Sequence, residues 1–166
     1  GYSDVLEHLE SFNGRFSRYR TLESEILSLD GENTNLRAQR QSFGPARGAL
    51  DSFRKAIRDA AGTATPAARW QAQALAAEAI AAMLEISVLH APHIAEAQDS
   101  EMTRIEGEIE VLERDARRRL EEMTPLLLSG AGAHLSAARE ALERFAALND
   151  EIVARVHADL AGKAVG

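Results

Sequence analysis

Apolar side chains recur every three or four positions over residues 5 to 57, and this spacing constrains the fold more than any other feature of the chain. Alternating steps of three and four keep side chains on one side of an α-helix, as in coiled coils. A helix of that length spans roughly 80 Å. The stripe consists of Val5, Leu9, Phe12, Phe16, Tyr19, Leu22, Ile26, Leu29, Asn33, Leu36, Arg40, Phe43, Leu50, Phe53 and Ile57.

The composition supports helices and excludes several classes of protein. The 166 residues include no cysteine and only 5% aromatic residues, which suits the packing of helices on Ala and Leu. The formal net charge is −7, and DNA or RNA binding needs clustered Lys and Arg, so we expect no nucleic-acid partner. We also expect no signal peptide and no membrane span, because the most apolar run contains Glu78 and Glu85.

Two turns divide the chain. Gly62 can end a helix, and Pro66 suits the first position of the next one. The segment 129–132, Ser-Gly-Ala-Gly, forms the second turn. We therefore predict one helical-bundle domain over residues 1–166, with long legs at about 3–61 and 66–129 and a last helix at about 133–162. The second leg should kink or break near Pro92.

The later parts of the chain carry apolar seams of the same kind. One seam is formed by Met102, Ile105, Ile109, Leu112, Ala116, Leu120, Met123 and Leu127, and the last helix has another, formed by Leu135, Ala138, Leu142, Phe145, Leu148, Ile152, Val156 and Leu160. Together the seams predict an all-α fold, an elongated antiparallel helical bundle with coiled-coil-like packing.

This division leaves half of the long hairpin without partners, because the last helix pairs with only the nearer half of the second leg. A second copy of the chain could supply the partners. Alternatively, the kinks could fold the legs into a compact five-helix bundle, or the partners could lie in sequence outside this chain. The sequence is compatible with all three arrangements.

Asn33, Arg37 and Arg40 share one face of the first helix, at spacings of four and three residues. A guanidinium in an apolar seam is costly unless it is paired, and a small carboxylate could complete it through a bidentate pair. These residues are therefore candidates for binding an anionic ligand. In the alternative interpretation, Arg40 pairs with a glutamate of a neighbouring helix and Asn33 sets the register of the bundle.

His90 and His93 are further candidates. Two antiparallel legs that turn near residue 64 place them beside Arg37 and Arg40, at the rim of the same pocket. With Glu96 they could also form a metal-binding face, but two histidines are a weak signal for a metal. We favour a polar break between helical segments over a metal site and expect no metal.

Sequence patterns of enzymes and cofactor proteins are missing. The chain has no Glu-x-x-His pair for a di-iron bundle, no Gly-x-Ser-x-Gly turn and no cysteine nucleophile. We therefore expect a protein that is not an enzyme and that carries no cofactor.

Two segments resemble the extracytoplasmic sensor domains of bacterial chemoreceptors and related histidine kinases, of the four-helix-bundle and helical bimodular families. Residues 36–43, Leu-Arg-Ala-Gln-Arg-Gln-Ser-Phe, look like the arginine-bearing stretch of the first helix of such sensors. Residues 145–153 look like the helix that returns toward the membrane. The expected three legs depart from the even number of helices that brings both ends of such a domain to one membrane.

The resemblance implies a function and a location. It implies the ligand-binding sensor domain of a transmembrane chemoreceptor, in which Arg37 and Arg40 grip the carboxylate of an organic acid or amino acid and helices move in response. It also implies a homodimer in the periplasm, anchored in the inner membrane by spans outside this chain. The alternative is a non-catalytic coiled-coil scaffold or adaptor that binds a protein partner.

Overall fold

The computed structural model describes residues 12, 14–23, 34–96 and 98–163. It divides into two units, residues 1–33 and 34–166. In the first unit, residues 14–23 are helical, as the apolar stripe predicts. Phe16, Tyr19 and Leu22 are exposed on this helix, and the rings of Phe12 and Phe16 stack with their centroids 6.0 Å apart. Asn33 lies outside the described residues.

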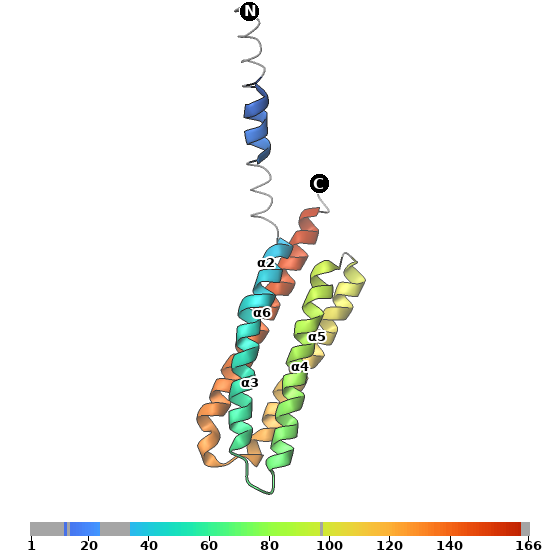
Figure 1. Ribbon diagram of the computed structural model, residues 1–166. Coiled ribbons are helices and arrows are strands. Elements are labelled where there is room, and N and C mark those ends of the chain that lie inside the picture. The colour runs from blue at the N-terminus through green and yellow to red at the C-terminus, as the bar shows by residue number, and fades with distance from the viewer. Residues whose placement is uncertain (1–11, 13, 24–33, 97, 164–166) are drawn as a thin grey trace, which may run out of the picture. The chain divides into compact units, whose positions relative to one another are not determined.

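The second unit is an all-α antiparallel bundle of four legs (Figure 1). Its elements are α2 Thr34–Gln41, η1 Ser42–Ala46, α3 Arg47–Gly62, α4 Arg69–Ala95, α5 Asp99–Met123, η2 Thr124–Leu126, η3 Ser129–Ala131 and α6 Gly132–Lys163. α2, η1 and α3 follow one another as the first leg. This leg packs along α6, and α4 packs along α5.

The second expected leg is in fact two antiparallel helices, α4 and α5. The chain does not break at Pro92, which lies inside α4, but reverses after Ala95. Glu96 and Gln98 both adopt extended backbone conformations, and the Glu96 carboxylate accepts a hydrogen bond from the Gln98 N–H at 2.8 Å. A proline removes only one hydrogen bond from a helix, whereas the extended backbone at Glu96 ends it. Four legs thus replace the three that the sequence suggested.

The first leg contains a π-helical turn, η1, that changes which residues face the core. Pro45 lies within it, and the wider turn accommodates a residue that has no N–H to donate. Ala38, Ser42 and Ala46 are buried around the turn, whereas Phe43 is 69% exposed. The expected seam is therefore wrong at Arg40 and Phe43, because small residues four positions apart are buried there instead. Further along the same leg, Leu50, Phe53 and Ile57 of the seam are buried as expected.

The remaining seams are confirmed where the structure describes them, with Leu112, Leu127 and Leu148 partly buried and the side chain of Leu160 outside the described residues. Met102, Ile105, Ile109, Ala116, Leu120 and Met123 of α5 are buried, and so are Leu135, Ala138, Leu142, Phe145, Ile152 and Val156 of α6. The two turns at the lower end of the bundle are joined, since Leu128 N–H donates to Thr63 O at 3.3 Å. α3 ends at Gly62 and α6 begins at Gly132, as expected, but α4 begins at Arg69, three residues after Pro66.

Helix α4 is long and apolar enough, by length and composition, to cross a membrane. Its most apolar window has a mean hydropathy of 1.6, and 44% of that window is buried inside the bundle. The core helix of a bundle passes the same test. Glu78 of α4 forms an ion pair with Arg119 of α5 at 2.8 Å, and we therefore interpret α4 as a core helix.

Candidate functional site

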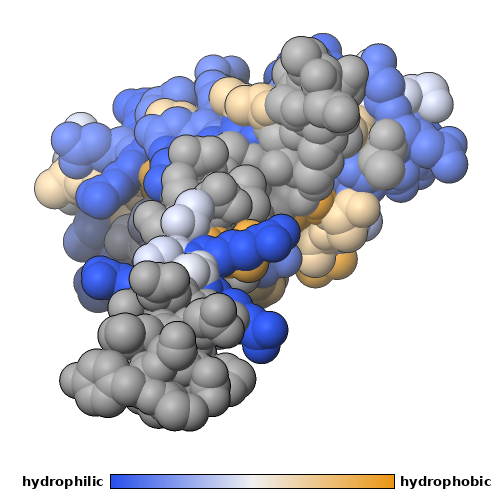
Figure 2. Space-filling view, turned by 90° about the horizontal axis from the view of Figure 1, so that it is seen from above, coloured by the Kyte–Doolittle hydropathy of each residue, from blue (hydrophilic) through white to orange (hydrophobic). Residues whose placement is uncertain are grey.

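A shallow cavity of about 410 Å³, widely open to solvent, lies between the first leg and α6, and three arginines line it. Arg37 and Arg40 come from α2, and Arg155 comes from α6, with Gln41 and Pro45 completing the wall. Hydrophilic side chains cover much of the described surface when the molecule is viewed from above, the end at which α2 begins and α6 ends (Figure 2). The two arginines singled out in the sequence are thus brought together, and the third was missed.

Within the part of the chain that the structure describes, the carboxylate of Glu151 shares this region with the arginines. Glu151 lies one turn before Arg155 on α6, with 3.7 Å between its Oε2 and Arg155 Nη2, and it also accepts a hydrogen bond from Gln41. Arg155 Nε is buried and has no hydrogen-bond partner among the described residues. Guanidinium groups from both legs thus line the cavity, and such groups bind carboxylates through charge-assisted, often bidentate hydrogen bonds.

The structure does not bring the histidines to this cavity. From a turn near residue 64, the sequence predicted that His90 lies opposite Arg37. His90 instead contacts Ser42, which lies five residues further along the first leg. His90 and His93 are 2% and 1% exposed, inside the bundle. The placement of His90 and His93 beside Arg37 and Arg40 is therefore wrong, because the longer loop after Gly62 and the π-helical turn shift the register between the legs.

His90 belongs to a chain of hydrogen bonds that crosses the bundle. Ser42 Oγ lies 2.8 Å from His90 Nδ1, and His90 Nε2 lies 3.0 Å from Asn149 Oδ1. Asn149 Nδ2 donates to Glu113 Oε1 at 3.1 Å. A carboxylate only accepts, so Asn149 must present its carbonyl to His90, which makes His90 Nε2 a donor and Nδ1 the acceptor from Ser42. The four side chains come one from each leg, and all three hydrogen bonds are donated in the same direction, from Ser42 toward Glu113.

The chain of hydrogen bonds continues to the surface between α5 and α6. Arg117 of α5 donates to Glu113 at 3.4 Å and to Glu143 of α6 at 3.0 Å. Long polar side chains therefore link these two helices. Asn149 could have been suspected from the sequence, since a polar residue directly follows Leu148 in the seam of the last helix.

Burial moves the pKa values of His90 and Glu113, two members of this chain of hydrogen bonds, in opposite directions. Desolvation lowers the pKa of His90 below its ordinary 6.5, opposed by the hydrogen bond to Asn149 and reinforced by the nearby His93. Desolvation raises the pKa of the half-buried Glu113 above its ordinary 4.5, and Asp150 adds to this effect while Arg117 opposes it. The interior of the bundle therefore favours the uncharged form of each group.

This difference predicts that acid destabilises the bundle through His90. Below about pH 6.5 the unfolded chain binds a proton at this residue that the folded chain does not, so stability falls as the pH falls. Glu113 acts oppositely, since its contribution is present at low pH and lost as the pH rises through its raised pKa. We expect wild type to lose up to about 1.4 kcal/mol per pH unit relative to His90→Gln as the pH falls below about 6.5.

Urea unfolding of both proteins at several pH values, with EDTA present because metal ions bind histidine, measures this difference. Glutamine keeps both hydrogen bonds but cannot titrate. Parallel pH profiles for the two proteins would contradict the assignment.

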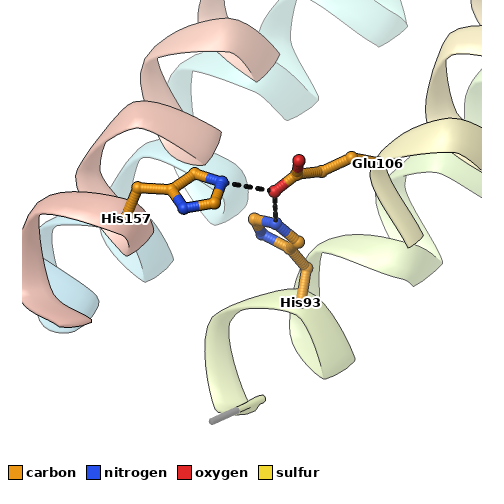
Figure 3. Close-up of side chains that lie close together, drawn as sticks. All are labelled: His93, Glu106 and His157. Atoms are coloured by element: carbon orange, nitrogen blue, oxygen red, sulfur yellow. Dashed lines mark hydrogen bonds and ion pairs between the residues drawn. The ribbon is translucent and has the colours of Figure 1, made fainter. Parts of the chain in front are cut away.

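His93, the other candidate histidine, lies in a separate cluster with Glu106 and His157 (Figure 3). The Nε2 atoms of His93 and His157 lie 2.8 Å and 2.7 Å from the same oxygen, Glu106 Oε1. The three residues come from α4, α5 and α6. Glu106 and His157 were missed in the sequence because they are distant from His93 along the chain and only the antiparallel pairing brings them together.

Comparisons of the chain with protein-family models, with curated proteins and with solved structures find no match.

Proposed function

We propose that this chain is the ligand-binding sensor domain of a bacterial transmembrane chemoreceptor, and that its ligand is a small organic acid or amino acid bound through its carboxylate. The observation that carries the proposal is the cavity lined by Arg37, Arg40 and Arg155. It lies between the first and last legs of the bundle, which are the legs through which a signal would leave such a domain.

The topology of the bundle supports this function. α2 begins and α6 ends at the same end of the four-leg bundle (Figure 1). An even number of antiparallel legs suits a domain that is held at one membrane by both of its ends. The three legs expected from the sequence would have placed the two ends at opposite ends of the bundle. Membrane spans outside this chain and a periplasmic location belong to the same proposal.

The proposed signal is a small displacement of α6 against the first leg. A carboxylate that bridges Arg40 and Arg155 would replace Glu151 as the partner of Arg155. That surface pair contributes only about 0–1 kcal/mol, so a ligand can displace it at little cost. Because the ligand contacts both legs, it favours whichever packing brings the arginines closest, by its difference in affinity for the two packings.

We expect a small acid to raise the melting temperature of the wild-type domain by several degrees at a hundred times its dissociation constant, and Arg40→Ala and Arg155→Ala to abolish the shift. A thermal-shift screen against organic acids and amino acids measures this. Arg139→Ala is the matched control, since Arg139 is an exposed arginine of α6 that does not line the cavity. A shift that survives in both cavity variants would place the ligand elsewhere.

The alternative function, a scaffold or adaptor that binds a protein partner, is favoured by one observation. Phe16, Tyr19 and Leu22 form an exposed apolar stripe on the helix at residues 14–23. A homodimer, which the resemblance to sensor domains implies, would also cover this stripe. Absence of any hit in the acid screen would favour the scaffold, and sedimentation velocity reads the oligomeric state directly.

A further inference from the structure

We propose that His93, Glu106 and His157 form a binding site for a divalent transition-metal ion of the Zn²⁺ class. Their three ligand atoms all lie within 4.8 Å of one another, although the residues come from α4, α5 and α6. Figure 3 shows both imidazole rings turned toward the same carboxylate. This site is separate from the arginine cavity and goes beyond the proposed sensor function.

The donor set selects the class of ion. Two imidazole nitrogens and one carboxylate oxygen are the ligands of many zinc sites that keep a fourth position open. The same set suits iron(II), whereas Ca²⁺ and Mg²⁺ prefer oxygen ligands throughout. We therefore expect Zn²⁺ to bind, and Mg²⁺ and Ca²⁺ to fail at similar concentrations.

Side-chain movements are needed to admit the ion. Ligand atoms around a tetrahedral zinc with bonds of about 2.0–2.1 Å lie about 3.3 Å apart. The contacts of 2.8 Å and 2.7 Å from Glu106 to the two histidines would each lengthen by roughly half an ångström, and the two histidine nitrogens, which lie within 4.8 Å of each other, would reach the same spacing. Glu106 and His157 reach this by small rotations of partly exposed side chains, while His93 stays fixed in the core.

One side of the site is buried in the bundle, and the other side is exposed to solvent. The side chain of His93 is 1% exposed, whereas those of Glu106 and His157 are 24% and 42% exposed. Water or a ligand group can therefore occupy the fourth position from the solvent side, and the ion has a route in.

The surroundings of His93 indicate an exchangeable ion. When Nε2 binds a metal, the ring proton resides on Nδ1, which usually donates to a second partner. Nδ1 of His93 is buried and has no hydrogen-bond partner among the described residues. A missing partner of this kind typically lowers metal affinity 10–100-fold, so we expect weaker binding than in a closed structural zinc site.

A bound ion would join three legs near the end of the bundle opposite the paired turns at Thr63 and Leu128. It would thereby fix α6 against α4 and α5. Elsewhere, α5 and α6 are linked by long polar side chains such as Arg117 and Glu143.

The test is a calorimetric titration of EDTA-treated, dialysed protein with ZnCl₂, together with thermal unfolding of the protein with and without the metal. We expect one ion per chain and a rise in melting temperature of several degrees that MgCl₂ and CaCl₂ do not produce. His157→Ala should weaken binding more than about 100-fold, because it removes a ligand rather than the partner of a ligand. Glu106→Gln, which keeps a hydrogen-bond acceptor in place, should also weaken it.

His134→Ala is the matched control, since His134 lies on α6 outside the cluster and should leave binding unchanged. Replacing zinc with Co²⁺ gives a second reading, because visible absorption bands report nitrogen and oxygen ligands in a four- or five-coordinate site. Zinc binding of equal strength in wild type, His157→Ala and Glu106→Gln would overturn the proposal, and so would the absence of zinc binding in wild type.

Discussion

Replacing Asn149 with leucine is expected to lower the free energy of unfolding by about 2–4 kcal/mol. Asn149 is 3% exposed, accepts the hydrogen bond from His90 and donates one to Glu113. Leucine fills a similar volume but leaves the His90 Nε2–H and the half-buried Glu113 carboxylate without this partner. A buried polar group without a partner costs more than an average hydrogen bond contributes.

Urea unfolding followed by circular dichroism measures this loss. Arg139→Leu, at an exposed position of the same helix, serves as the control and should change stability by less than about 0.5 kcal/mol. The double variant His90→Leu/Asn149→Leu tests the contact itself. We expect its loss to fall short of the sum of the single losses by about 0.5–3 kcal/mol, because each single change orphans the other residue. Additive losses would contradict the hydrogen bond between them.

Replacing Phe145 with alanine is expected to cost about 3–5 kcal/mol. The ring is fully buried, and its centroid lies 6.1 Å from that of His90 at an interplanar angle of 20°. The truncation removes apolar contacts and leaves a cavity beside the imidazole. Water that enters the cavity would hydrate His90, so we also expect its lowered pKa to move back toward 6.5, which NMR titration can follow.

Phe43→Ala provides the matched control for this truncation. Phe43 belongs to the apolar stripe of the sequence, yet it is 69% exposed. Its replacement should change stability by less than about 0.5 kcal/mol. A loss at Phe43 as large as that at Phe145 would mean that the stripe, rather than the alanine face through Ala38 and Ala46, packs in the core.

The candidate site was only partly predictable from the sequence. Arg37 and Arg40 share a cavity because they lie one turn apart on one helix, a relation that local spacing determines. Arg155, which completes the cavity, comes from the last helix. Its position opposite Arg40 depends on the pairing of the first leg with α6.

The histidines show the same limit. His90 and His93 were recognised as polar residues in an apolar segment, but their partners were not. Ser42 reaches His90 only because a π-helical turn and a six-residue loop set the register of the first leg against α4. Glu106 and His157 meet at His93 only because the chain reverses after Ala95.

The sequence by itself determined the class of fold, the apolar seams of α5 and α6 and the turns near Gly62 and Gly130. These follow from the 3.6-residue period of a helix and from residues that end it, and both act over a few positions. Only the tertiary structure decided how many legs the bundle has, which face of the first leg is buried and which polar side chains meet. Those outcomes depend on register between helices distant in sequence, which small local changes in backbone conformation are enough to shift.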